Sequence, residues 1–138
     1  MREMLCRAKV KDKDELIGKG FPIDENGNPI SEWVYGVPTP IQGYPDLFTA
    51  WNAFNGEYEE LAVITETICQ YTGLTDKNGL TKVFEYDIID ANGRKVGNYY
   101  ENSNLLKDGT CFLVARMGTK EWSRSEQEAI KRGCKYAE

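Results

Sequence analysis

Residues 70–74 read Gln-Tyr-Thr-Gly-Leu, residues 76–79 read Asp-Lys-Asn-Gly, and residues 97–102 read Gly-Asn-Tyr-Tyr-Glu-Asn. These runs are rich in the residue types that tight turns require. The first run predicts a strand that ends in a turn at Thr72-Gly73, with Leu74 returning to the core. Gly97-Asn98 predicts a close backbone approach or a bulge beside that strand, and residues 101–104 predict a polar exit loop.

Apolar and polar residues alternate on both sides of these runs, which is typical of β-strands. The predicted strands cover residues 33–37, 61–71, 83–89, 95–100 and 111–117, and residues 4–10 are a further candidate. In residues 45–55, Leu47, Trp51 and Phe54 share one helical face before Gly56, so a short helix is favoured there, with a hairpin as the alternative. The chain is therefore expected to be mainly β, with a minor α+β character.

The pattern Asp-x-Asn-Gly occurs three times, at residues 24–27, 76–79 and 90–93. Each copy predicts a turn with its glycine, and also its asparagine, at positive φ. A calcium loop is the alternative, because alternating Asp and Asn present oxygen ligands. The spacing argues against it: Tyr35 stands where the first loop needs a glutamate, and Leu80 and Arg94 occupy the fifth positions of the other two.

A helix is predicted over residues 124–132. Ser123-Arg124-Ser125-Glu126 has the form of a capping box, in which Ser123 and Glu126 bind each other's backbone amides. Gly133 is the expected stop. Its apolar content is limited to Ala129 and Ile130, with Trp122 just before it, so this helix should pack on the surface through a narrow stripe.

The turn-rich runs resemble the YopX family of phage and prophage proteins, whose members carry Gln-Tyr-Thr-Gly-Leu, Asp-Lys-Asn-Gly and Gly-Asn-x-Tyr-Glu-Asn. Trp33-Val34-Tyr35-Gly36 and the start Met1-Arg2-Glu3 are also similar to family segments. The resemblance implies a small SH3-like barrel and a phage or prophage protein. It does not indicate any particular biochemical activity. Because residues 90–96 are shorter than the family's intervening segment, a partly open barrel is the alternative.

A chain of 138 residues is expected to form one domain. We divide it into a β or irregular region over residues 1–60, a small-barrel core over 61–118, and a C-terminal helical region over 119–138. No apolar run reaches membrane-spanning length, and the charged N-terminus lacks the apolar centre of a secretion signal. We therefore expect a protein of the bacterial host cytoplasm, with no contact to membranes.

Metal, cofactor and enzyme functions are not expected. The chain contains no histidine, and its four cysteines form no Cys-x-x-Cys pair. Glu85, Asp87 and Asp90 are candidates for an acid/base pair or a magnesium site, but the first two are expected on the solvent side of a strand whose other phase is Phe84, Tyr86 and Ile88. Cys69 and Cys111 are candidate nucleophiles, but both fall in apolar strand patterns typical of buried thiols.

Two kinds of binding function remain. The favoured one is a protein-interaction or self-assembling module, most simply a homo-oligomer or a partner of a phage or host protein, because Tyr and Trp are abundant and anchor interfaces. The alternative is a single-stranded nucleic-acid module. It would stack bases on Tyr71, Tyr99 or Tyr100 beside four cations, Lys77, Lys82, Arg94 and Lys95. The net charge of -5 argues against nucleic acid.

Seven residues of the turn-rich runs are the candidate binding residues. They are Gln70, Tyr71, Asp76, Asn78, Tyr99, Glu101 and Asn102. Their residue types also suit a purely structural role in turns, which is the stronger interpretation.

Overall fold

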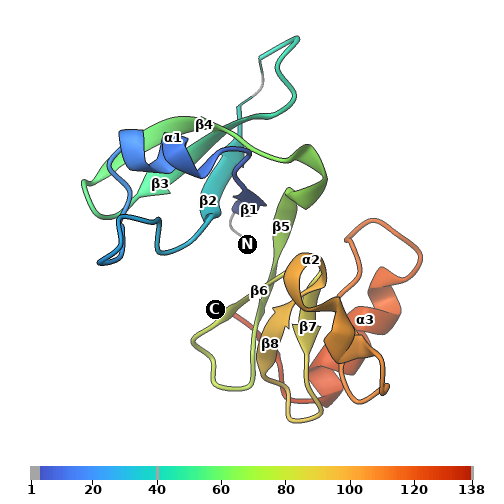
Figure 1. Cartoon of the computed structure of the whole chain (residues 1–138). Coiled ribbons are helices and arrows are strands. Elements are labelled where there is room, and N and C mark those ends of the chain that lie inside the picture. The colour runs from blue at the N-terminus through green and yellow to red at the C-terminus, as the bar shows by residue number, and fades with distance from the viewer. Residues whose placement is uncertain (1–3, 40, 138) are drawn as a thin grey trace. The chain divides into compact units, whose positions relative to one another are not determined.

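Antiparallel strands dominate the computed structural model, which describes residues 4–39 and 41–137 (Figure 1). The mainly β prediction is confirmed. Residues 1–3, which belong to the family resemblance, lie outside the described residues. The chain divides into two compact units, residues 4–68 and 69–137, and each is described by itself. The prediction of a single domain with three regions stays a prediction.

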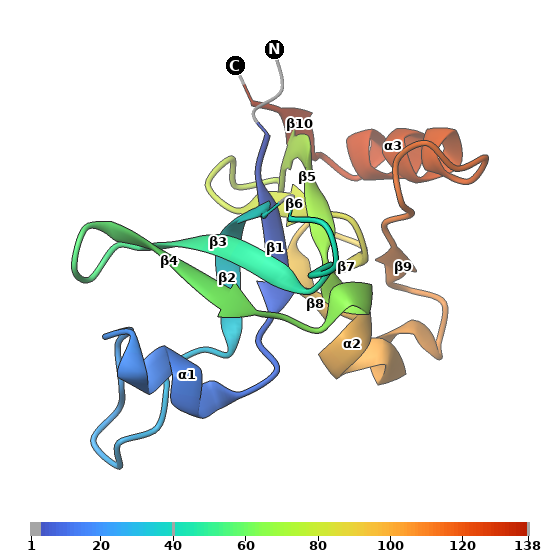
Figure 2. The ribbon, with the colours of Figure 1, turned by 90° about the horizontal axis from the view of Figure 1, so that it is seen from above.

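The N-terminal unit is a four-stranded antiparallel sheet in the order β1 (Cys6–Lys9), β2 (Trp33–Pro38), β3 (Leu47–Asn52) and β4 (Glu57–Ala62). Figure 2 shows these strands and the short helix α1 (Lys13–Gly18), whose Leu16 packs into the core. Buried residues alternate with more exposed ones in β2 and β3, as in a sheet with one covered face, whereas β1 has three consecutive buried residues and β4 has only Leu61 buried. The core consists of Cys6, Ala8, Val10, Leu16, Val34, Phe48, Ala50, Leu61 and Val63.

The helix predicted over residues 45–55 is wrong, because this segment contains β3 and the turn after it. Phe48 and Ala50 point into the core, while Trp51 points away from it. The helical spacing of Leu47, Trp51 and Phe54 therefore does not describe one buried face, and Phe54 is 74% exposed. Hairpin pairing with β4 satisfies the backbone instead.

The strand predicted over residues 61–71 is interrupted. β4 ends at Ala62, the 3-10 turn η1 (Thr65–Thr67) follows, and β5 (Cys69–Thr75) begins the second unit. Thr67 stabilises the turn because its hydroxyl donates to the carbonyl of Ile64 at 2.6 Å and accepts the amide of Lys9 at 2.8 Å. A threonine in this role looks like a strand residue in the sequence.

The C-terminal unit contains two small antiparallel groups of strands. β5 pairs with β6 (Lys82–Phe84) and β10 (Lys135–Tyr136), and β7 (Asp87–Ile89) lies between β8 (Lys95–Asn98) and β9 (Phe112–Leu113). α2 (Tyr99–Asn102), η2 (Ser103–Leu106) and α3 (Trp122–Lys131) complete the unit. Across the described residues the sheets are open, so the closed SH3-like barrel is not formed.

Three predicted strands of this unit are shorter than expected. Residues 83–89 are divided at Tyr86, whose φ of 64° turns the chain from β6 into β7. Residues 95–100 leave the strand at Asn98, and residues 111–117 keep only Phe112–Leu113 as strand. Residues 70–74 show the opposite deviation: β5 continues through Gly73, at φ 90°, as an irregular strand rather than ending in a turn.

All three Asp-x-Asn-Gly turns are confirmed. In each one the aspartate Oδ1 accepts the amide two residues later, at 2.9 to 3.1 Å. The glycines have φ of 80°, 76° and 79°. The asparagines do not share this conformation, because Tyr86 is the one non-glycine residue with positive φ in the described parts of the chain. That part of the prediction is wrong.

The C-terminal helix is confirmed but its predicted cap is wrong. α3 begins at Trp122, so Ser123 lies in the first turn, and no side chain caps the helix at Glu121. The end is as expected: Gly133 has φ 112°, and the amide of Cys134 donates to the carbonyl of Ala129 at 3.0 Å. The helix packs through Ala129 and Trp122 against the core of this unit, while Ile130 is exposed.

Candidate functional site

The candidate binding residues of the turn-rich runs hold the C-terminal unit together. Gln70 and Glu85 exchange two hydrogen bonds, and the buried ring of Tyr71 lies 5.6 Å from that of Phe84. Asp76 is buried in its turn, where it accepts the amide of Asn78. These contacts are internal, which agrees with a structural role for this part of the motif.

Tyr99, Glu101 and Asn102 belong to α2, so the exit loop predicted for residues 101–104 is wrong. Asn98 caps this short helix because its Oδ1 accepts the amides of Tyr100 and Glu101. In turn, Oδ1 of Asn102 accepts the amide of Asn98 at 3.1 Å. A Cβ on Gly97 would lie 2.4 Å from Oδ1 of Asn102, so the group that approaches Gly97 is a side chain and not the predicted backbone. The predicted alternative, a bulge, agrees with the register shift between β7 and β8, although this places Gly97 beside β7 and not β5.

Glu85 and Asp87 are buried, so the prediction that they face solvent is wrong. Oε1 and Oε2 of Glu85 accept the amides of Gln70 and Met117 at 2.8 and 2.9 Å. Oδ2 of Asp87 accepts the amide of Phe84 at 2.7 Å and lies 3.1 Å from Nζ of Lys95. The irregular backbone where the chain leaves β6 needs these acceptors.

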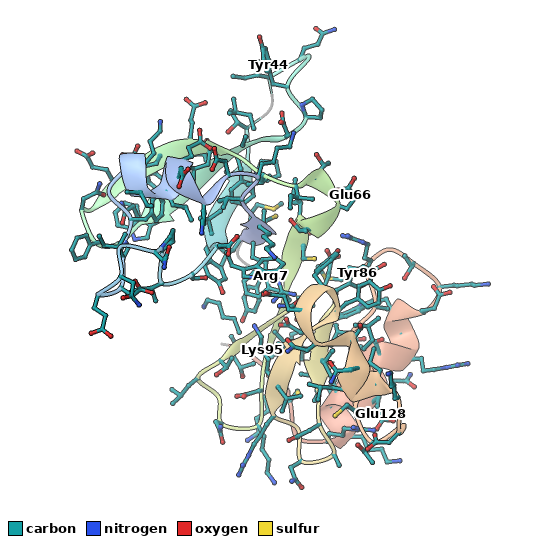
Figure 3. All side chains as sticks on the ribbon, viewed as in Figure 1. Arg7, Tyr44, Glu66, Tyr86, Lys95 and Glu128 are labelled. Atoms are coloured by element: carbon teal, nitrogen blue, oxygen red, sulfur yellow. The ribbon has the colours of Figure 1, made fainter. Side chains whose placement is uncertain are left out.

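Tyr86, Tyr99 and Tyr100 form a cluster of rings at α2, and Arg116 contacts two of them, Tyr86 and Tyr100. Figure 3 labels Tyr86. The guanidinium lies 4.6 Å from the centre of the Tyr86 ring and 3.5 Å from Oε1 of Glu85. It also donates to the hydroxyl of Tyr100 at 3.3 Å. Burial raises the pKa of Tyr100, so its hydroxyl stays protonated. Since Arg116 is already held by these groups, the cluster serves as internal support.

No group of three or more His, Cys, Asp or Glu side chains suited to a metal ion occurs within residues 4–39 and 41–137. Oδ1 of Asp90 accepts the amides of Asn92 and Arg94 in its own turn. Each of the three candidate carboxylates, Glu85, Asp87 and Asp90, therefore accepts backbone amides of the fold.

The cysteines differ in accessibility. Cys6, Cys69 and Cys134 are buried, whereas Cys111 is partly exposed and precedes β9. The prediction of a buried thiol is thus confirmed for Cys69 and wrong for Cys111.

Iodoacetamide at pH 8 should therefore modify Cys111 well before the other cysteines. Burial raises the pKa of the Cys134 thiol to about 11, so little of the reactive thiolate is present at this pH. Peptide mass mapping over time measures the order, and urea-unfolded protein provides the control in which all four react. Modification of Cys134 as fast as Cys111 would contradict this description of the C-terminal unit.

A second, more exposed group of aromatic side chains lies on the N-terminal unit. Trp51 is paired with Tyr58 across β3 and β4, with ring centres 4.9 Å apart. The register Gly36 to Ala50, extended by one residue, places Tyr35 on the other side of Trp51. Cross-strand neighbours share a face, so Tyr35, Trp51 and Tyr58 form an aromatic row on the face opposite the core. Their exposed fractions are 43%, 45% and 68%.

Sequence reasoning missed this row, although its signal is present. In each of the three strands the aromatic residue occupies the phase opposite to the buried residues Val34, Ala50 and Leu61. Taken alone, each strand shows a single aromatic residue on its less buried side. The three aromatic residues become neighbours only when the pairing register of the strands is known. None of the sequence-predicted binding residues contributes to the row.

Charge is distributed unevenly between the units. Residues 4–68 contain five lysines and arginines against eleven aspartates and glutamates, so this unit carries all of the net negative charge of the chain. Three of the glutamates, Glu57, Glu59 and Glu60, are on β4, and Glu60 shares the face of the aromatic row, whereas Glu57 and Glu59 lie on the opposite face. The strand at the end of the aromatic row is therefore acidic on both of its faces.

Comparisons with protein-family models, with curated proteins and with solved structures found no match for this chain. Among the described residues, no helix combines the length and the apolar character needed to cross a membrane.

Proposed function

We propose that this protein is a non-enzymatic protein-interaction module that binds its partner through the aromatic row of the N-terminal unit. The observation that carries the proposal is the exposure of Tyr35, Trp51 and Tyr58 side by side on a sheet face. Exposed aromatic side chains grouped on a rigid sheet supply large contact area at low entropic cost, and Trp and Tyr are the residues that dominate binding energy in protein interfaces. A second copy of the chain is one such partner.

Single-stranded nucleic-acid binding is the weaker candidate. Of its proposed stacking residues, Tyr71 is buried between its neighbours, and Lys95 is engaged with Asp87. Tyr99 is the accessible one, at 46% exposure. The aromatic row itself lies in the acidic unit, where phosphates are repelled. These features favour a protein partner.

The resemblance of residues 70–74, 76–79 and 97–102 to the YopX family adds a proposed setting. It supports a phage or prophage accessory protein that acts in the cytoplasm of the bacterial host and meets a phage or host protein there. The motif supplies no chemistry for the aromatic row, so partner binding rests on the N-terminal unit alone.

Substitution of all three row residues by threonine should abolish partner binding. Threonine suits exposed strand positions, so the sheet is expected to keep its fold while the contact area is lost. The matched control is Phe54→Thr, which removes an even more exposed aromatic from the turn next to the row. Light scattering measures self-association, and affinity capture followed by mass spectrometry measures other partners.

The proposal fails if the triple variant keeps the same partners as the wild type, or if Phe54→Thr loses them equally. Fluorescence anisotropy with single-stranded DNA and RNA provides the competing test. Salt-sensitive binding that survives the triple variant would reverse the ranking of the two functions.

A further inference from the structure

The edge of the N-terminal sheet next to the aromatic row is open. Within the described residues β4 pairs with β3 alone. The amide of Ala62 donates to Oε1 of Glu15 and its carbonyl accepts from Lys11, so its backbone points away from β3. Because antiparallel pairing alternates, the N–H and C=O groups of Tyr58 and Glu60 point the same way. No partner for them occurs among the described residues.

The side chains around this edge differ between the two faces of the sheet. Tyr58 and Glu60 lie on the face of the aromatic row, whereas Glu57 and Glu59 lie on the opposite face. A strand added beside β4 would have alternate side chains next to these two sets. One set would lie next to Tyr58 and Glu60, and the other would lie next to Glu57 and Glu59.

We propose that β4 binds an extended basic segment of a partner protein as an added strand, with aromatic or aliphatic residues alternating with Lys or Arg. This inference rests on the proposed function and specifies its partner. The strand would pair with the backbone of Tyr58 and Glu60, extend the aromatic row by its apolar residues, and place its cations beside Glu57 and Glu59.

Charge decides between this partner and a second copy of the chain. Pairing β4 with β4 would bring Glu57, Glu59 and Glu60 of both copies into one narrow strip, and like charges on adjacent strands are destabilising. A row of glutamates at an open edge is also a common protection against self-pairing. The acidic N-terminal unit instead attracts and orients a basic segment.

A peptide probe tests the chemistry directly. The probe is a nine-residue peptide of Lys alternating with Val and Tyr, carrying a fluorophore, and its binding to the full chain is followed by anisotropy. Two matched peptides serve as controls: one has Glu in place of each Lys, and one is N-methylated at alternate amides so that it cannot donate along the paired edge. Each control should bind at least about tenfold more weakly.

Variants of the chain separate the parts of the proposal. Glu60→Pro removes one outward-facing amide without touching the aromatic row, and proline is tolerated at a sheet edge. Glu60→Pro should weaken binding of the Lys peptide at least about tenfold, whereas Glu60→Gln should weaken it less. Glu25→Gln, far from β4 in the sequence, should leave binding of the peptide unchanged. Circular dichroism confirms that each variant is folded.

The possible outcomes separate strand addition at β4 from the proposed protein-interaction function on which it rests. Equal binding of the Lys, Glu and N-methylated peptides, or full binding by Glu60→Pro, would overturn strand addition, and so would a concentration-dependent dimer that Glu60→Pro dissolves. If the threonine triple variant still abolishes capture of the natural partner in those cases, the interaction module stands and only its mode of binding is wrong.

Discussion

Replacing Lys95 by methionine should lower the free energy of unfolding by about 3 kcal/mol. Asp87 is completely buried, and its Oδ2 lies 3.1 Å from Nζ of Lys95. Methionine keeps most of the apolar stem but removes the charge that compensates the buried carboxylate. We expect the lower end of the range for broken buried pairs, because the Lys95 side chain keeps 19% of its surface in contact with solvent.

Urea unfolding at neutral pH measures this effect. Lys107→Met is the matched control, because Lys107 is exposed, and it should change stability by less than about 0.5 kcal/mol. The double variant Asp87→Asn with Lys95→Met should recover part of the loss, since it removes the buried charge. A Lys95→Met protein as stable as the wild type would show that the pair is not buried as described.

Replacing Gly93 by valine should cost at least about 3 kcal/mol, through backbone strain and a steric clash together. Gly93 has φ 79°, a conformation that β-branched residues avoid. A Cβ at this position would also lie 2.2 Å from the carbonyl oxygen of Arg132, at the end of α3. The clash involves backbone on both sides, so rotation of a side chain cannot relieve it.

Gly79→Val separates the two causes. Gly79 ends the same type of turn in the same unit, with φ 76°, but a Cβ at this position would have no atom within 4 Å. This variant should therefore lose only about 1–2 kcal/mol from strain. Thermal unfolding of both variants gives the comparison. Equal losses would mean that the turn at Gly93 does not pack against the end of α3.

Local turn chemistry was readable from the sequence. Asp24, Asp76 and Asp90 each begin one of the predicted turns, where the aspartate accepts a backbone amide two residues later, and Gly133 ends α3 as predicted. Interactions of this kind depend little on the rest of the fold. Alternation along residues 33–37 also identified β2, and the further candidate over residues 4–10 contains β1.

The errors arise where distant contacts decide the structure. Glu85 and Asp87 have the spacing of solvent-facing residues, yet they are buried because amides of Gln70, Phe84 and Met117 need acceptors there. Tyr86 reverses the chain at positive φ although tyrosine has no preference for that conformation. Neither feature has a local signal.

The aromatic row could not be predicted from the sequence for a related reason. Tyr35, Trp51 and Tyr58 are separated along the chain, and one residue of register shift would place one of them in the core. Abundant aromatics pointed to a binding surface, but their position on the N-terminal unit required the strand pairing. The turn-rich motif drew attention to the C-terminal unit, where the same residues serve the fold.

Site-specific photo-cross-linking can show whether the aromatic row contacts a partner protein. A photoreactive phenylalanine is placed at Tyr58, in the aromatic row, or at Phe54, in the adjacent turn, and the full chain is irradiated in the cells that produce it. We expect a discrete cross-linked protein at Tyr58 that is absent at Phe54 and disappears when Trp51→Thr is added. The same products at both positions, unaffected by Trp51→Thr, would contradict a binding function for the aromatic row.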